Sequence, residues 1–452
     1  MKVLTLSMMY PHRPWPHYGV FVKNRMVEVA RLVDELTVVA PQPWFPLDHR
    51  LFPGKYGHRT AVPAEDVIEG VRVLYPRYLS IPAFVQQIKA LDPLTMAVAL
   101  AGVLIRHPEL RDVDIIDTHC AYPEGLAGSV VARLLGKPSV VTLRGHDIND
   151  VPDWSSIHRV EVKWALDLVD KVFSVARALA DGAIALGTPP DKCVVLSNGV
   201  DTSKFHPLDR LACRRKLGLP EEGRIVLAVG YIIRRKGQHL LTEAVGRLRR
   251  EEGFGDVRVA LVGGPGQEPG VMEDIERLMD QYELRGVVHL PGKIRQEELI
   301  DWYNAADVMC LASEKEGWAN VLLESLACGT PVVATNVWGT PEVITSPDLG
   351  VLVDRTVDDI QRGLREALAR TWDRDRLVAY AQTHTWEATA RRVVEQFREV
   401  VGGARAHAHA HAHAQAHAQA RAHAHAHVPG DESPGYATEA LRAGPAPEHT
   451  GE

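Results

Sequence analysis

The chain has 452 residues, 46% of them hydrophobic, which is enough for two or three domains with large cores. Its 51 Lys and Arg are outnumbered by 58 Asp and Glu, for a formal net charge of -7. This balance argues against a nucleic-acid-binding protein, because affinity for a phosphate backbone comes from clustered cations.

The N-terminal apolar run predicts a core strand, since it ends in Y-P-H-R-P-W-P without the small-residue cleavage site of a signal peptide. The longest other apolar stretch, residues 94–105, is too short to span a bilayer. Five dispersed cysteines without a C-x-x-C pair indicate reduced, mostly buried thiols. We therefore expect a cytoplasmic protein, with peripheral contact at the inner face of the membrane left open. The cysteines are Cys120, Cys193, Cys213, Cys310 and Cys328.

Residues 1–205 alternate expected strands with expected helices. This alternation predicts an α/β domain with a parallel sheet, helices on both faces, and ligands at the carboxyl ends of the strands. The expected strands are 3–7, 36–40, 114–117, 139–143 and 171–175, and the expected helices are 20–33, 96–105, 124–135 and 160–168.

Two of these strands end in residues that suit a binding site. The strand 114–117 delivers His119, although an isolated histidine is more often structural. The next strand runs into L-R-G-H-D, which makes Arg144, His146 and Asp147 candidates. A turn-capping role for Asp147 stays an equal alternative to a catalytic one.

After the turn-rich connector S-N-G-V-D-T-S-K-F-H-P the alternation restarts, which places a domain boundary near residue 205. We expect a second doubly wound domain over residues 206–385, with a ligand cleft between the two domains. Its expected strands are 225–230, 258–262, 287–290, 308–311 and 332–334, and a last helix is expected over 386–401.

A basic loop follows the first strand of this second domain. The sequence G-Y-I-I-R-R-K-G places Arg234, Arg235 and Lys236 at the top of a parallel strand, where cations can neutralise a diphosphate. The alternative is an ordinary solvated loop.

The segment E-G-W-A-N-V-L-L-E places Glu316 and Glu324 eight positions apart around the start of a helix. Backbone N-H groups near Ala319, Asn320 and Val321 could hold a phosphate, because the donors of a first helical turn lack intrahelical partners. The two carboxylates would accept hydroxyl protons on either side of it. The alternative is a pair of solvated helix charges.

Beyond Gly402 the sequence alternates alanine with polar residues. A period of two builds neither an amphipathic helix nor a core, so residues 402–452 are expected to be a disordered tail. Its imidazoles should bind divalent metal opportunistically, without a functional metal site. The eight clustered histidines are at positions 407, 409, 411, 413, 417, 423, 425 and 427.

The segment from Glu316 to Glu324 resembles the glutamate, seven residues, glutamate signature of retaining GT-B glycosyltransferases of family 4. The resemblance continues through A-C-G-T-P-V-V-A-T-N and G-T-P-E-V-I and covers residues 1–401. Y-P-x6-Y-G-V-F-V and L-R-G-H-D look most like the teichuronic-acid and cell-surface-polysaccharide branch. The resemblance implies two facing Rossmann-like domains, 1–205 on the acceptor side and 206–385 on the donor side, with the helix 386–401 returning to the first.

The resemblance also implies roles for single residues. Glu316 faces the transferred sugar, Glu324 the nucleotide ribose, and His119 the sugar near the reacting bond. Asp147 is a further catalytic candidate, and Gly19 lets a loop approach the donor where many members have two glycines.

The basic loop departs from the family pattern at one position. Lys236 matches the lysine that holds the donor diphosphate, but Tyr231 replaces the arginine, so Arg235 or Arg234 must supply a second cation. Trp338 stands where many members have glycine, and Arg144 and His146 would line the acceptor side.

The implied reaction moves a sugar from a nucleoside-diphosphate sugar, UDP favoured over GDP, to a saccharide or lipid-linked acceptor with retention. It serves cell-surface polysaccharide or glycolipid synthesis and needs no cofactor and no metal. No carboxylate pair is arranged as a double-displacement hydrolase requires. The alternatives are a nucleotide-sugar epimerase or a phosphorylase of the same fold, or a non-enzymatic sugar-nucleotide or metal-binding protein.

Overall fold

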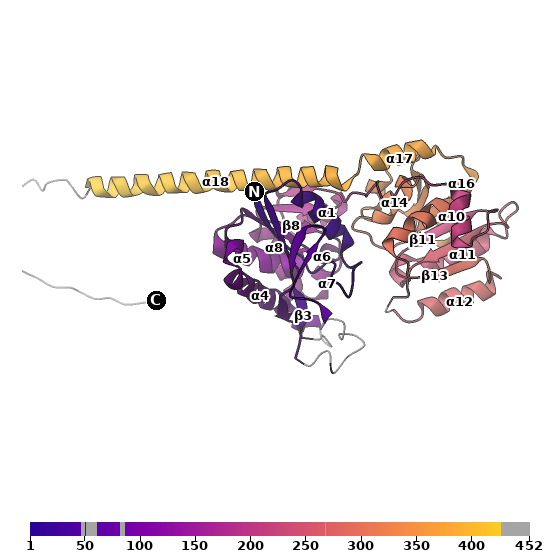
Figure 1. The fold of residues 1–452 in the computed structure, drawn as a ribbon, viewed down its shortest axis with the longest axis horizontal. Helices are drawn as coiled ribbons and strands as arrows, with labels where there is room; N and C mark the ends of the chain where they lie inside the picture. Colours follow the sequence, from indigo (N-terminus) through magenta and orange to yellow (C-terminus); the bar gives the residue numbers. More distant parts are fainter. Residues whose placement is uncertain (47–49, 51–60, 82–85, 267, 426–452) are drawn as a thin grey trace, which may run out of the picture. The chain divides into compact units, whose positions relative to one another are not determined.

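The computed structural model describes residues 1–46, 50, 61–81, 86–266 and 268–425 (Figure 1). Residues Met1–Val401 form one compact unit, and the chain from Gly402 on forms another.

The first domain is built on an eight-stranded sheet in the order β10-β9-β8-β7-β1-β2-β5-β4, parallel throughout except for β4 against β5. The central strands are fully buried runs of β-branched and aliphatic residues, as expected for a sheet covered on both faces. The strands are β1 (Lys2–Leu6), β2 (Glu35–Val39), β4 (Glu65–Ile68), β5 (Val71–Leu74), β7 (Ile115–His119), β8 (Ser139–Leu143), β9 (Lys171–Ser174) and β10 (Cys193–Val195).

Five short strands of this domain were not expected, namely the three-residue β10 and four others. β4, β5 and the two-stranded ribbon of β3 (Gln42–Trp44) and β6 (Arg77–Leu79) have only three or four residues each. Such lengths are too short for a period of two to stand out in the sequence.

The helices of the first domain cover both faces of the sheet. Val22 and Met26 of α1 share a core with Val393 and Phe397 of α18, so the C-terminal helix belongs to the core of the first domain. The helices are α1 (Val20–Ala30), η2 (Gln86–Leu91), α4 (Asp92–Arg106), η3 (Pro108–Arg111), η4 (Ala121–Gly125), α5 (Leu126–Leu135), α6 (His146–Asn149), α7 (Val151–Trp154), α8 (Ser156–Leu168), α9 (Arg177–Ala185), η5 (Pro190–Lys192) and α18 (Trp386–His425).

The apolar helix around α4 is longer than the sequence suggested. Because η2 precedes α4 directly, the stretch Ile88–Arg106 is long and apolar enough to cross a membrane by length and composition. Met96, Leu100 and Val103 of α4 pack against the sheet instead, in the manner of a core helix.

The second domain has a six-stranded parallel sheet in the order β13-β12-β11-β14-β15-β16. Two cores cover its faces, as expected for a doubly wound domain. The strands are β11 (Ile225–Val229), β12 (Arg258–Val262), β13 (Val288–Gly292), β14 (Val308–Leu311), β15 (Val332–Thr335) and β16 (Gly350–Val353). The helices are α10 (Arg210–Leu217), η6 (Arg234–Lys236), α11 (Gln238–Leu248), α12 (Val271–Gln281), η7 (Gln296–Glu298), α13 (Leu299–Ala305), α14 (Asn320–Ala327), α15 (Thr340–Val343), α16 (Val357–Ala369) and α17 (Arg374–Gln382).

Helix α18 runs on to His425, whereas a helix ending at Val401 and a disordered tail were expected. Alanine at every second position explains the difference, since alanine has the highest helix propensity and needs no apolar stripe to favour a helix. Residues 426–452 and the side chains of the tail histidines lie outside the described part, so opportunistic metal binding there stays a prediction.

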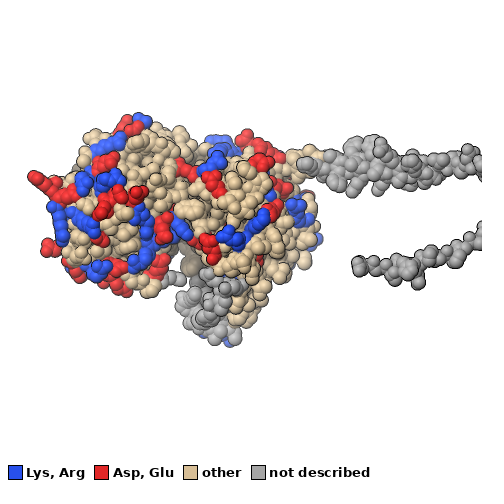
Figure 2. Space-filling model, turned by 180° about the vertical axis from the view of Figure 1, so that it is seen from behind, with Lys and Arg blue, Asp and Glu red and all other residues tan. Residues whose placement is uncertain are grey.

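The five cysteines are free thiols, four of them buried and Cys193 half-buried. On the face drawn in Figure 2, Lys and Arg are interspersed with Asp and Glu. The charges of that face therefore form a mixed surface, which keeps long-range electrostatic fields weak.

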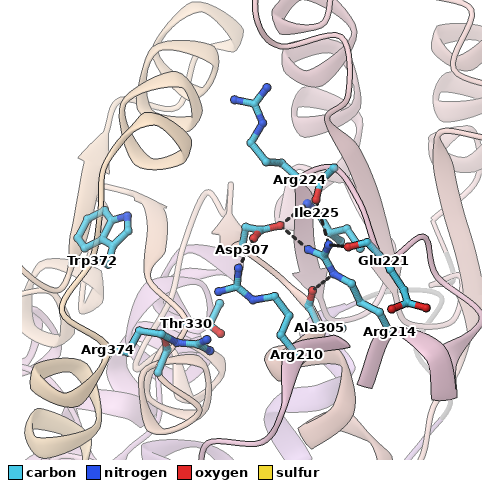
Figure 3. Close-up of polar contacts among 12 residues, drawn as sticks. Arg210, Arg214, Glu221, Arg224, Ile225, Ala305, Asp307, Thr330, Trp372 and Arg374 are labelled. Carbon is cyan, nitrogen blue, oxygen red and sulfur yellow. Dashed lines mark hydrogen bonds and ion pairs between the residues drawn. The ribbon is translucent and has the colours of Figure 1, made fainter. Parts of the chain in front are cut away.

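An arginine-aspartate cluster holds the starts of β11 and β14 together (Figure 3). Asp307, which precedes β14, accepts hydrogen bonds from Arg210 at 2.6 Å, Arg214 at 2.6 Å and the backbone N-H of Ile225 at 2.7 Å. Arg214 also donates to the carbonyl of Ala305 at 2.9 Å. Hydrogen bonds from two guanidinium groups to one carboxylate are charge-assisted and strong, so they hold the two strands together.

We expect Asp307→Ala to lower the free energy of unfolding by about 3 kcal/mol, because the side chain of Arg214, 3% exposed, would keep its charge without a carboxylate. Urea unfolding measures the loss. Asp358→Ala is the matched control, since that aspartate is 84% exposed and its ion pair with Arg247 is worth about 1 kcal/mol or less. Equal effects of the two substitutions would contradict a structural role for the cluster.

Candidate active site

A polar cavity of about 350 Å³ is lined by residues from both domains. Its walls come from the loop after β8, the connector after β10, the basic loop and the segment before α14. We call it the polar cavity. It is lined by Phe21, Arg144, Gly145, His146, Asn149, Asp150, Val175, Asn198, Arg235, Lys315, Glu316, Gly317, Trp318 and Asn320.

Glu316 lies in the wall of the polar cavity and is 8% exposed. Its carboxylate accepts a hydrogen bond from the ammonium group of Lys236. Burial alone would raise the pKa of Glu316, but the charge and hydrogen bond of Lys236 outweigh it and hold the pKa below the usual value. The structure thus brings together the glutamate and the lysine that the sequence singled out.

The other two cations of the basic loop have different surroundings. Arg235 lines the polar cavity and donates to the carbonyl of Lys315 at 2.8 Å. Arg234 instead pairs with Asp274 of α12 at 2.6 Å. Arg235 is therefore better placed than Arg234 to supply the second cation, in place of the family arginine that Tyr231 replaces.

Helix α14 begins at Asn320, with Ala319 at its N-cap. Asn320 lines the polar cavity and accepts a hydrogen bond from the side chain of Asn198 at 3.1 Å. Ala319 is buried and Val321 packs partly against the core of the second domain. Of the three residues expected to hold a phosphate, Asn320 is the one that reaches this cavity.

Glu324 lies one turn farther along α14, outside the lining of the polar cavity. Its carboxylate accepts a hydrogen bond from the hydroxyl of Tyr303 at 2.7 Å. Burial raises the pKa of Glu324 to about 7, and the bond from Tyr303 opposes that rise. Tyr303 was not predicted as a site residue, because the sequence of α13 does not reveal that its hydroxyl faces Glu324.

His119 is buried, and it lines neither the polar cavity nor a larger cavity that adjoins it. It is the last residue of β7, paired with Thr142 of β8, whereas it was expected to follow the strand. One ring nitrogen contacts Asp117 at 3.0 Å and the other accepts from Arg144 at 3.2 Å. Burial lowers the pKa of His119 to about 4, so the ring is neutral near pH 7. In this structure the ring accepts a hydrogen bond from Arg144 and so orients it, and the expected contact with a sugar stays a prediction.

Asp147 has the contacts of a structural residue. Its buried carboxylate accepts hydrogen bonds from the backbone N-H groups of Ala121 at 2.9 Å, Gly145 at 2.8 Å and Arg144 at 3.1 Å. These bonds fix the turn after β8, which corresponds to the turn-capping alternative. The carboxylate contacts no described side chain that could serve as a catalytic partner.

His146 is the histidine that faces the site. It lines the polar cavity, and its side chain is 63% exposed. Its Nδ1 lies 2.8 Å from Asp150, whose other oxygen accepts from Lys315 of the second domain at 2.9 Å. These two contacts hold the pKa of Asp150 below its usual value although burial opposes them.

The backbone conformation and the close packing at position 19 require a glycine there. It has φ +65° at the N-cap of α1, and a Cβ there would lie 2.1 Å from the carbonyl oxygen of Met9. Gly19 lies outside the lining of the polar cavity, and the expected close approach to a donor stays a prediction. Trp338, which stands in a glycine position of the family, has φ +46°, the left-handed region that glycine prefers.

A second, larger cavity of about 520 Å³ adjoins the polar cavity, with which it shares Phe21, Arg144 and His146. We call it the apolar cavity because most of its wall is aromatic and aliphatic. It is lined by Met8, Met9, Tyr18, Phe21, Pro43, Tyr78, Lys89, Asp92, Cys120, Tyr122, Pro123, Glu124, Arg144, His146, Asp147, Val151 and Trp154.

Asn198 was not singled out in the sequence, where S-N-G read only as a turn. Its side-chain oxygen accepts from Arg144 at 2.8 Å and from Arg25 at 3.1 Å, and its amide donates to Asn320. Within the described ranges, no group of three or more His, Cys, Asp or Glu could hold a metal ion.

The chain is similar to two family models and to several known proteins. Residues 209–384 match the model of the glycosyl transferases group 1, and residues 19–204 match glycosyltransferase family 4. TuaC of Bacillus subtilis, named for teichuronic acid biosynthesis, is 28% identical over 75% of this chain and 82% of its own. The D-inositol 3-phosphate glycosyltransferase of Kineococcus radiotolerans is 31% identical over 75% of this chain and 83% of its own.

Two solved structures have the same arrangement of elements. Sucrose-phosphate synthase from Thermosynechococcus elongatus superposes with a TM-score of 0.71 at 18% identity, over 89% of this chain and 100% of that chain. HepE of Anabaena in complex with UDP superposes with a TM-score of 0.65 at 19% identity, over 88% of this chain and 100% of that chain.

We expect Lys236→Met to lower the free energy of unfolding by about 2 kcal/mol at pH 7.5, because Glu316 would stay buried without its cation. In the parent, the lowered pKa of Glu316 gives stability that is present above about pH 4.5 and is lost as the pH falls through the folded-state pKa. In the variant, unopposed burial raises that pKa. The difference in the free energy of unfolding between parent and variant should therefore shrink as the pH falls.

Urea unfolding of parent and variant at pH 7.5 and pH 5 measures this dependence. Arg234→Met is the matched control, because that cation pairs with Asp274 at the surface and should show a small loss at both pH values. A deficit of Lys236→Met that is constant with pH would show that the ion pair does not govern the ionisation of Glu316.

Proposed function

Because the chain belongs to the group 1 glycosyl transferases of family 4, with the GT-B fold, we propose that it is a retaining transferase that uses a nucleoside-diphosphate sugar. The observation that carries this proposal is the pairing of Glu316 with Lys236 in a polar cavity lined by both domains. Glu316 belongs to the glutamate signature and Lys236 to the basic loop, segments about eighty residues apart in sequence that contribute to one site.

The donor diphosphate would lie against Arg235 and Lys236, close to the start of α14. Cations and first-turn N-H groups stabilise an anionic leaving group without being consumed, and their effect grows as negative charge develops. Glu316 would then accept hydroxyl protons of the sugar, and Glu324 those of the ribose. UDP is the proposed nucleotide, as it is in the solved complex of HepE.

The proposed chemistry is a same-face displacement. The departing diphosphate takes up the proton of the attacking acceptor hydroxyl, so the new bond forms on the face that the leaving group vacates. This route needs no carboxylate nucleophile, and Glu316 is tied to Lys236 and Asp147 to backbone N-H groups. The protein contributes orientation and charge stabilisation.

The acceptor would approach from the first domain, where Arg144 and His146 lie in the walls of both cavities. His146 is placed to hydrogen-bond an acceptor hydroxyl or the sugar beside it. A saccharide or lipid-linked acceptor in cell-surface polysaccharide or glycolipid synthesis, at the cytoplasmic face of the membrane, fits the likeness to TuaC.

A screen of UDP-sugars and GDP-sugars against saccharide and glycolipid acceptors tests the function. We expect release of UDP with one donor sugar and a product whose anomeric configuration, read by proton NMR, equals that of the donor. An inverted product would refute the mechanism. Isomerised donor without transfer would support an epimerase instead.

We expect Glu324→Gln to weaken UDP binding by about 1.5 to 3 kcal/mol, because a ribose diol would lose a charged acceptor. Since burial raises the pKa of Glu324 to about 7, the carboxylate takes up a proton as the pH falls from 8 to 6, and UDP affinity of the parent should fall with it. Calorimetry at both pH values measures the affinities.

Glu366→Gln makes the same change at an exposed position of α16 and should bind UDP as the parent does. The control also separates the ionisation of UDP itself from that of Glu324. Unchanged affinity in Glu324→Gln would remove this residue from the ribose site.

A further inference from the structure

The apolar cavity has a volume and a wall composition that suit a less polar ligand than a sugar alone. Its volume, about 520 Å³, exceeds that of the polar cavity, and its wall includes Met8, Tyr78, Tyr122, Val151 and Trp154. Ring contacts keep part of this wall rigid, since Trp154 lies 6.2 Å from Tyr122 and 5.2 Å from His146 between ring centroids. An apolar wall around a cavity of this size favours a ligand that removes apolar surface from water.

The cations in this wall are already occupied. Lys89 donates to Ser80 at 2.6 Å and pairs with Asp92 at 3.4 Å. The guanidinium of Arg144 is held by His119 and Asn198. Among the described residues of this wall, neither Lys89 nor Arg144 is available to a phosphate group without breaking an existing contact.

The acidic groups in this wall disfavour an anion further. Glu124 is 1% exposed, and one of its oxygens accepts from the backbone N-H of Met8 at 2.9 Å. Burial raises the pKa of Glu124 to about 8 and also raises the pKa of Asp92. A neighbouring phosphate would lie in the same poorly solvated wall, where neither carboxyl group supplies a positive charge to pair with it.

We propose that the apolar cavity binds an uncharged apolar group carried by the acceptor, directly beside the hydroxyl that is glycosylated at His146. The proposal rests on the proposed sugar transfer, since the two cavities meet at Phe21, Arg144 and His146. It names the acceptor class as an amphipathic glycoside or glycolipid. It excludes phosphorylated acceptors such as the one in the name of the Kineococcus radiotolerans relative.

Paired acceptors that share one sugar and differ in the attached group test this directly. We use the phenyl and methyl glycosides of glucose, galactose, mannose and N-acetylglucosamine, and the 6-phosphates of the same free sugars, with the donor found in the screen. We expect kcat/KM for the phenyl glycoside to exceed that for the methyl glycoside at least tenfold, and the sugar phosphates to react more slowly than either.

Met8→Gln places a polar group of similar size in the apolar wall. We expect it to reduce the phenyl-to-methyl ratio of kcat/KM severalfold. Met272→Gln, the same change at a half-buried methionine of α12 in the second domain, should leave the ratio unchanged. The same glycolipid head group in phosphatidylcholine vesicles distinguishes a membrane source of the acceptor from a soluble one.

Equal kcat/KM for phenyl and methyl glycosides, or faster reaction of the sugar phosphates, would overturn the proposal while leaving sugar transfer intact. If no acceptor in the panel reacts, calorimetry with phenyl and methyl glycosides in the presence of UDP decides. Absence of preferential phenyl-glycoside binding, or a preference that Met8→Gln does not reduce, overturns it. Failure of UDP itself to bind would count against the proposed function instead.

Discussion

The buried guanidinium of Arg144 is the group on which the arrangement of the site depends. It follows β8 directly, donates to His119 of β7 and to Asn198 after β10, and lies 5.4 Å from the centre of the Phe21 ring. Burial lowers the pKa of Arg144 to about 10, so each partner also offsets part of the cost of removing a cation from water. Through Asn198 these contacts extend to Asn320 at the start of α14.

The same network combines two cations with two buried carboxylates. Arg25 and Arg144 share the side-chain oxygen of Asn198, and the charges of Asp117 and Asp147 oppose the lowering of the pKa of Arg144 that burial causes. Because His119 is neutral, these two guanidinium groups and two carboxylates are the charges that act on one another in a medium of low polarity. Arg235 adds a further cation from the second domain.

Local patterns predicted the two doubly wound domains, because their strands are continuous apolar runs and their helices carry apolar stripes. The same patterns located Glu316 and Lys236, which adjoin sharp turns of recognisable composition. They ended the strand before His119 at residue 117, whereas β7 runs on to His119 and places this side chain within the sheet. They could not reveal Asn198 or Tyr303, whose roles come from partners 122 and 21 residues away in the chain. They ended the last helix at Val401, whereas α18 extends to His425, because alternation was weighed above the helix propensity of alanine.

The meeting of a polar and an apolar cavity at His146 has a consequence for the chemistry. Apolar walls exclude water, and charge interactions strengthen where water is absent. In the proposed reaction, a ligand filling the apolar cavity would therefore exclude water from the acceptor side of the site, where hydrolysis of the proposed donor would otherwise compete with transfer. The neutral carboxyl of Glu124 fits this arrangement, since an ionised group there would draw water toward the reacting centre. Burial of an apolar group of the acceptor in this cavity would thus both bind the acceptor and protect the proposed donor from hydrolysis.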